Sequence, residues 1–139
     1  MHYASIPRKI IIEEKIGVVN LPADFKFHVF ENNGHPKWFL QIDNGRYTNH
    51  IRNYYDSTLR LLELQVLHPN GEYQLPEACY IEKMSNLALK LADSLSYARV
   101  DFYLVKDKIY FGEITLTPGS GFEKFSDKEV DVEWGKYWD

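Results

Sequence analysis

Residues 99–121 (RVDFYLVKDKIYFGEITLTPGSG) read as two antiparallel strands joined by a tight turn, and this hairpin constrains the fold most. If residues 106–108 form a three-residue turn, Asp101 lies opposite Glu113, whereas a two-residue turn would put these two acids on opposite faces. With the three-residue turn, one face is nearly all apolar. This face, which we expect to lie against the core, carries Val100, Phe102, Leu104, Tyr110, Ile114 and Leu116.

The opposite face of the hairpin gathers Arg99, Asp101, Glu113 and Thr115 at its open end. Directly opposed side chains have Cβ atoms ~4.5–5.5 Å apart, so the two acids need a shared proton, Arg99 or a divalent cation between them. Mg²⁺, which proteins hold with carboxylates and substrate phosphates, fits this set. Two solvated acids on an exposed sheet face are an equally supported alternative.

The rest of the chain predicts an α+β fold, in which one long helix packs on an antiparallel sheet. Alternating residues predict a hairpin from residues 25–30 and 38–42, and residues 10–12 predict a buried strand. Residues 59–67 are ambiguous between helix and strand, and residues 44–57 are expected to form a loop. The tail after residue 121 is expected to hold a short terminal helix. Apolar spacing predicts a helix over residues 76–95, with a stripe of Tyr80, Met84, Leu87, Ala88, Leu91, Ala92 and Leu95.

Length, charge and cysteine content exclude several classes of protein. The 139 residues suit a single domain, and a net charge of -4 disfavours a protein that grips a nucleic-acid backbone. The single cysteine fits a reducing, cytoplasmic setting, and no apolar run approaches the ~20 residues of a membrane span. We expect Cys79 to be a buried structural thiol and His28 to be a surface side chain. The five histidines lack the spacing of metal ligands.

The order R-x-D, then E-x-T-x-x-P-G, resembles the end of the ATP-grasp fold. In that superfamily an Asp and a Glu on neighbouring strands hold Mg²⁺ against the phosphates of ATP, and the residue two after the Glu is a further ligand. The resemblance implies that Asp101, Glu113 and Thr115 are metal ligands, with Thr115 standing where Asn is usual. It also implies that Arg99 stabilises charge on a phosphate or an intermediate, and that the P-G turn lies near the acceptor substrate.

Two upstream stretches resemble other parts of the same fold. KIIIEE (residues 9–14) resembles the strand that leads into the adenine hinge, which makes Glu13 and Glu14 hinge candidates. ADFKFHVF (residues 23–30) resembles the next strand, which implies that Asp24 binds the ribose hydroxyls and Lys26 a phosphate. Each pair taken alone favours surface charge, whereas their order and spacing relative to the hairpin favour a nucleotide site.

A narrower resemblance is to the TupA-like ATP-grasp family, carried by IIIEEKI, LPADFKFHVF, YYD, YFGEIT, TPGSGF and a final D…WGKYW. A Thr after the metal Glu is usual in that family. The family is linked to teichuronopeptide and surface-polysaccharide biosynthesis, and its members are often labelled glycosyltransferases. The implied activity is ATP-dependent ligation of a carboxylate-bearing acceptor to an amine. Tyr55 and Asp56 could belong to the acceptor site or order their loop.

The resemblance also implies a second lobe. ATP-grasp enzymes clamp ATP between two lobes, and the first lobe supplies a phosphate-binding Lys, a mobile glycine-rich loop and a second Lys near the adenine. Because this chain begins at the hinge strand, we expect it to be the C-terminal lobe alone, a truncated product or half of a split enzyme. Its missing N-terminal lobe or a partner subunit would complete the site, and alone it would bind ATP weakly.

Three other functions stay open at this point. A metal-dependent nuclease also places an Asp and a Glu on a hairpin, but Thr115 occupies the position of its catalytic Lys. A glycosyltransferase commonly holds a metal with D-x-D, and the nearest match is Asp131-Val132-Glu133. A non-catalytic remnant that only folds or binds a partner fits a single lobe.

Overall fold

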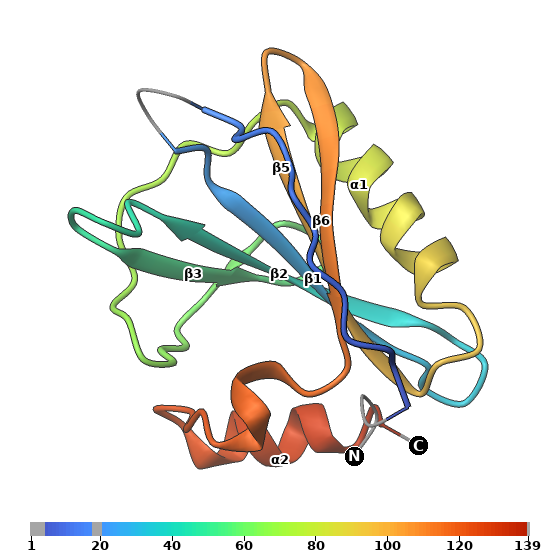
Figure 1. Cartoon of the computed structure of the whole chain (residues 1–139). Helices are drawn as coiled ribbons and strands as arrows, with labels where there is room; N and C mark the ends of the chain where they lie inside the picture. The colour runs from blue at the N-terminus through green and yellow to red at the C-terminus, as the bar shows by residue number, and fades with distance from the viewer. Residues whose placement is uncertain (1–4, 18–20, 139) are drawn as a thin grey trace.

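Six antiparallel strands form one sheet, with helix α1 against one face and helix α2 against the other (Figure 1). The computed structural model describes residues 5–17 and 21–138. The helices are α1 (Ala78–Leu91) and α2 (Lys128–Gly135), and a short turn, η1 (Pro118–Gly121), precedes α2. The α+β class is confirmed, and α2 is the predicted terminal helix. The strand order is β4-β3-β2-β1-β5-β6, with bounds Asp24–Phe30 (β1), Lys37–Asn44 (β2), Ile51–Tyr55 (β3), Leu61–Leu62 (β4), Tyr97–Val105 (β5) and Lys108–Thr115 (β6).

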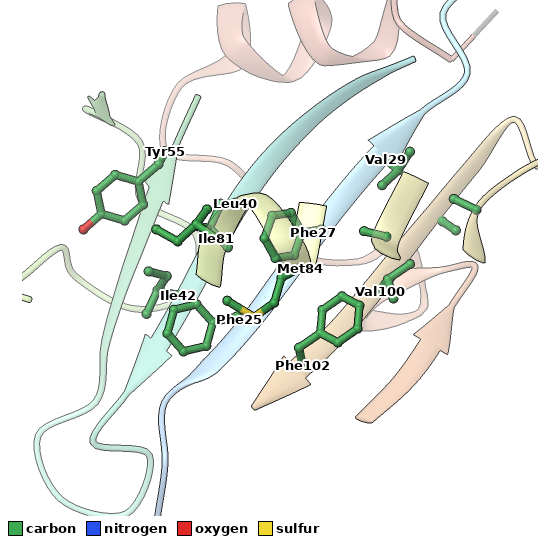
Figure 2. Close-up of a cluster of buried hydrophobic side chains, with 13 residues drawn as sticks. Phe25, Phe27, Val29, Leu40, Ile42, Tyr55, Ile81, Met84, Val100 and Phe102 are labelled. Carbon is green, nitrogen blue, oxygen red and sulfur yellow. The ribbon is translucent and has the colours of Figure 1, made fainter. Parts of the chain in front are cut away.

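The main core lies between α1 and the sheet, where every second residue of β1, β2 and β5 points at the helix (Figure 2). Helix α1 contributes Ile81, Met84 and Ala88 to this core. The helix is shorter than the predicted 76–95, and Leu87 and Leu91 of the predicted stripe are exposed, while Ile81 is buried in their place. No helix among residues 5–17 and 21–138 is long and apolar enough to cross a membrane.

The predicted hairpin of residues 25–30 and 38–42 is confirmed as β1 and β2, whereas the loop predicted for residues 44–57 is wrong. Residues 51–55 of that segment form β3, which pairs with β2. The polar residues of β3 misled the prediction because they are buried: Arg52 lies directly opposite Asp43 and pairs with it. Of the ambiguous residues 59–67, only Leu61–Leu62 form a strand.

The buried strand predicted for residues 10–12 is also wrong. These three isoleucines lie in irregular chain, and their side chains are 79–93% exposed. An apolar run becomes a strand only beside another strand, and none of the described strands pairs with this segment. The segment instead passes over the polar face of the sheet, where Glu13 and Glu14 line a cleft described below.

The β5–β6 hairpin reaches the predicted arrangement of its acids by a different route. Its turn has two residues, Lys106 and Asp107, both with positive φ, so the predicted three-residue turn is wrong. A β-bulge then opposes Gly112 and Glu113 to Asp101 alone. Beyond this extra residue, each β6 side chain points to the opposite face of the sheet from the one the two-residue turn alone would give. Glu113 therefore lies on the same face as Asp101.

Gly112 suits the bulge because a Cβ there would lie 3.1 Å from the carbonyl oxygen of Asp101, so a larger residue would need a backbone shift of a few tenths of an ångström. The shift in parity occurs only beyond the bulge. Tyr110, before it, therefore faces Tyr103 on the polar side of the sheet and not the core side predicted from the three-residue turn.

Candidate functional site

The polar face of β1, β5 and β6 brings together most of the predicted site residues. In the sheet register Lys26 lies directly opposite Asp101, and Arg99 directly opposite Thr115. Asp101 is only 2% exposed, and its Oδ2 accepts a hydrogen bond of 2.6 Å from Lys26 Nζ. The buried Asp101 carboxylate is thus paired with a cation from the neighbouring strand β1.

Arg99 links the two acids of the hairpin. Its Nε donates to Asp101 Oδ1 at 2.8 Å, and its Nη2 donates to Asp101 Oδ2 at 2.9 Å. The same Nη2 lies 2.9 Å from Glu113 Oε1 and 3.1 Å from Thr115 Oγ1, and the Thr115 hydroxyl donates to Glu113 Oε1 at 2.9 Å. Burial lowers the pKa of Arg99, but its hydrogen bonds to Asp101 and the Asp101 charge outweigh this and raise it, so the guanidinium stays charged.

The donor set fits a hard divalent cation. No group of three or more His, Cys, Asp or Glu side chains that could hold a metal occurs among the described residues. Mg²⁺ seldom needs such a cage, because it binds through one or two carboxylates and completes its ligands with water and substrate phosphates. Asp101, Glu113 and Thr115 offer two carboxylates and a hydroxyl that already surround one cationic nitrogen.

An open cleft runs from this cluster to the N-terminal segment. It measures about 450 Å³ and is lined by Glu13, Glu14, Asp24, Lys26, Asp101 and Glu113, among others. An adjoining opening of about 800 Å³ shares part of that lining and continues over residues 43–48. Both volumes lie in the range of ligand sites. Six of the eight predicted site residues therefore line one cleft, and the other two, Arg99 and Thr115, touch it through Asp101 and Glu113.

Two side chains of this cleft escaped the prediction. Arg46 Nη2 lies 2.9 Å from Asp24 Oδ2, and Tyr103 lines the cleft beside them, where burial and the Asp24 carboxylate raise its pKa to about 12. The other oxygen of Asp24, Oδ1, is buried without a hydrogen bond in the described part of the chain. Arg46 follows a turn glycine in a segment predicted as loop, and no sequence pattern marks it.

A second, smaller opening of about 240 Å³ lies between the sheet and α2. Aromatic rings form much of its wall, with the η1 turn at one side. At Gly119 in that turn φ is +53° and a Cβ would clash with the Glu123 side chain, so glycine is required there. The opening is lined by His28, Phe30, Tyr54, Tyr97, Thr117, Pro118, Gly121, Glu123, Phe125, Asp131, Trp134 and Trp138, among others.

His28 is buried beneath this opening, so the surface position predicted for it is wrong. Burial lowers its pKa to about 4, and the ring is therefore neutral near pH 7. Its Nδ1 lies 2.8 Å from the Tyr97 hydroxyl and its Nε2 lies 2.8 Å from Gln41 Oε1. Because Gln41 Oε1 can only accept, Nε2 carries the proton and Nδ1 accepts from Tyr97. Gln41 Nε2 then donates to Asp43 Oδ2 at 2.8 Å, on the wall of the 800 Å³ opening.

The low pKa of His28 predicts how stability depends on pH. Its folded pKa of about 4 lies below the ordinary value of 6.5, so the unfolded chain binds the extra proton between these pH values. The free energy of unfolding should rise by about 3 kcal/mol as pH increases from 4 to 6.5, and stay level above that. Urea unfolding at several pH values should show this rise in the wild type and not in His28→Gln. A variant of the exposed His35, His35→Gln, should keep the wild-type slope; a His28→Gln slope equal to the wild type would contradict the assignment.

Three remaining sequence predictions can be placed. Cys79 is exposed at the start of α1, so the predicted buried thiol is wrong. The Asp56 carboxylate accepts hydrogen bonds from Thr58 and Arg60 in its own loop, which favours the loop-ordering role. The D-x-D match at residues 131–133 lies in helix α2, where side chains two apart do not face each other.

Comparison with known proteins gives one match. The sequence model of the family described as "TupA-like ATPgrasp" matches residues 1–139, the whole chain. No curated protein and no solved structure matches.

Proposed function

Because this chain belongs to the TupA-like ATP-grasp family, we propose that the cleft between the N-terminal segment and the β5–β6 hairpin binds ATP with Mg²⁺. The observation that carries the proposal is the cluster at the end of the cleft. There, Lys26 and Arg99 converge on Asp101, and Arg99 extends to Glu113 and Thr115. Two cations and two carboxylates in one place can receive a triphosphate and its metal together.

The proposed roles follow the cleft from one end to the other. Glu13 and Glu14 border the adenine, which neighbouring backbone groups read by hydrogen bonds. Asp24 accepts from the ribose hydroxyls, and its Oδ1, which lies 3.7 Å from Lys26 Nζ but accepts no hydrogen bond among the described residues, supports this role. Lys26 contacts a phosphate, and at the far end of the cleft Asp101, Glu113 and Thr115 would hold Mg²⁺.

The proposed reaction joins a carboxylate to an amine. An oxygen of the acceptor carboxylate attacks the γ-phosphorus, ADP leaves, and an acyl phosphate forms. The amine then attacks the acyl carbon, phosphate leaves, and a proton is lost from nitrogen. Arg99 stabilises the negative charge that develops on the transferring phosphoryl group, while a bound Mg²⁺ would neutralise the phosphates. We place this ligation in cell-surface polysaccharide or teichuronopeptide biosynthesis, following the family.

The acceptor is proposed to enter by the smaller opening beside α2. Thr117 and the η1 turn line that opening, and Thr117 is two residues from Thr115 at the phosphate cluster. The proposed acceptor opening and the proposed phosphate cluster therefore lie next to each other at the end of β6. Full activity is proposed to need the parts that the first lobe contributes in ATP-grasp enzymes, from the same polypeptide or a partner subunit.

Isothermal titration of MgATP tests the proposal. Asp101→Asn and Glu113→Gln should each weaken binding by about 10- to 100-fold, because each removes a charged contact worth about 1.5–3 kcal/mol. The titrations should use the chain alone and the chain joined to a first lobe, since the lobe raises affinity. Glu82→Gln, on the exposed side of α1, is the matched control and should bind as the wild type does.

Two outcomes would overturn the proposal. One is the absence of MgATP binding even with a first lobe, and the other is wild-type affinity in both site variants. Cleavage of DNA in the presence of Mg²⁺ or Mn²⁺ would instead favour the nuclease alternative.

A further inference from the structure

One nitrogen of Arg99 lies among the three oxygens that the proposed function assigns to the metal. Nη2 is 2.9 Å from Asp101 Oδ2, 2.9 Å from Glu113 Oε1 and 3.1 Å from Thr115 Oγ1. These oxygens come from two strands and are gathered on one side of the guanidinium. A positive charge therefore already stands against the oxygens that a metal ion would use.

The charges of the cluster are balanced without a metal. Lys26 and Arg99 supply two positive charges, and Asp101 and Glu113 supply two negative charges. The Asp24 carboxylate, 3.7 Å from Lys26 Nζ, is matched in turn by Arg46. A divalent cation entering this cluster would meet two cations at close range, where Coulomb repulsion is strong because Lys26 and Asp101 are buried. The carboxylates can therefore accept a metal readily only after a cation has moved away.

A polyphosphate supplies the means to move that cation. Guanidinium groups bind phosphate oxygens in bidentate, charge-assisted pairs, as they bind carboxylates. The side of the cluster nearest the cleft is also its open side, since the Glu113 side chain is 63% exposed. A phosphate in the cleft can thus compete for Arg99 from the direction in which Glu113 already meets solvent.

We propose that Arg99 is a displaceable placeholder for the metal. It holds Asp101, Glu113 and Thr115 together while the cleft lacks nucleotide, and it leaves them when the phosphates bind it. This inference rests on the proposed function. It makes metal and nucleotide binding cooperative, because each favours the state in which Arg99 has left the carboxylates. Arg99 is then a positioning residue for the metal ligands as well as a phosphate contact.

Binding of Mn²⁺ in the absence of nucleotide tests the placeholder directly. Free Mn²⁺, counted by electron paramagnetic resonance, should show Arg99→Gln binding the ion at least fivefold more tightly than the wild type. The matched control is Arg46→Gln, which removes the same charge from the same cleft but pairs with Asp24. It should stay within twofold of the wild type. Equal or weaker binding in Arg99→Gln, or equal tightening in both variants, would overturn the proposal.

A measurement on the wild-type chain covers the case in which Arg99→Gln fails to fold. The Arg99 Nε–H group donates to Asp101, so its ¹⁵N–¹H signal reports on that contact. Mg²⁺ alone at low millimolar concentration should leave the signal in place, whereas MgATP should shift it and speed its exchange with water. Movement with Mg²⁺ alone, or no movement with MgATP at a concentration that saturates the site, would refute displacement.

The two proposals fail separately. If MgATP binds and Asp101→Asn abolishes binding, but Arg99 stays on Asp101, only the placeholder is wrong. Suppose instead that Arg99→Gln tightens Mn²⁺ binding while MgATP never binds, even beside a first lobe. Arg99 then does occupy the place of the metal ion, and only the proposed nucleotide site is wrong.

Discussion

Replacing Trp134 with alanine is expected to lower the free energy of unfolding by about 3–5 kcal/mol, the cost typical of removing a large buried ring. Trp134 is 6% exposed and holds α2 against the sheet. Its ring stacks on Phe39 with centroids 4.2 Å apart and lies 6.0 Å from Phe30 and 5.7 Å from His28. Truncation would leave a cavity at the centre of this aromatic cluster, which chemical denaturation followed by circular dichroism would measure.

Trp138 provides the matched comparison for Trp134. It also stacks on a ring, Tyr97, at 4.5 Å, but it is 45% exposed and lies beyond the end of α2. Trp138→Ala should therefore cost less than Trp134→Ala: about 0.5–1.5 kcal/mol for the aromatic pair, in addition to the smaller apolar area that its half-exposed ring buries. Equal losses in the two variants would mean that α2 is not anchored by Trp134. Because both rings line the opening proposed for the acceptor, both variants should also weaken acceptor binding.

The elements that sequence alone predicted well are those whose apolar residues face a single core. Residues 25–30 and 38–42 alternate because β1 and β2 turn every second side chain toward α1, and α1 itself shows the three- and four-residue spacing of a packed helix. The pattern worked there because the side chains that pack between α1 and the sheet form an apolar cluster, drawn in Figure 2.

The opposite face of the sheet could not be predicted from the same pattern. Every residue of β1 is buried, including Asp24, Lys26 and His28, because the polar side chains satisfy one another across strands. Alternation treats such residues as solvent-facing. It therefore places His28 at the surface and has no means of finding Arg46, whose partner lies 22 positions earlier.

The sequence placed Asp101 and Glu113 on one face of the hairpin, despite the wrong turn, because two deviations cancel. The predicted three-residue turn puts Glu113 on the face of Asp101, and the observed two-residue turn alone would not. The bulge at Gly112 restores that relation. A glycine inside a strand signals a bulge in general, but sequence does not tell which register it serves. The hairpin pattern brought Asp101 and Glu113 together with Arg99, whereas the pairing of Lys26 with Asp101 across β1 and β5 is visible only in the structure.

Replacing Asp43 with alanine is expected to lower the free energy of unfolding by about 3–5 kcal/mol, because it breaks a buried ion pair from one side. Asp43 Oδ1 accepts from Arg52 Nε at 2.6 Å, and Oδ2 accepts from Gln41 at 2.8 Å. Without the carboxylate, the buried Arg52 guanidinium keeps a 3.2 Å hydrogen bond to the Val66 carbonyl and a 3.7 Å approach to Glu123. Denaturant titrations at pH 7 would measure the loss.

The exposed pair of Arg60 with Asp56 separates the effect of burial from that of charge. Arg60→Ala removes a contact of 3.1 Å at the surface and should cost less than about 1 kcal/mol of unfolding free energy.

The Asp43 pair also predicts how stability depends on pH. Burial alone raises the pKa of Asp43, but Arg52 outweighs this and lowers it below the ordinary 3.8, so this carboxylate stabilises the fold above that pH. The loss of unfolding free energy in Asp43→Ala should consequently persist from pH 7 down to about 4 and shrink only at lower pH. A deficit that disappears near pH 6 would show that Asp43 is not held as a carboxylate by Arg52. The hydrogen bonds from His28 to Gln41 and from Gln41 to Asp43, which link the two openings, would then form without support from the Asp43–Arg52 ion pair.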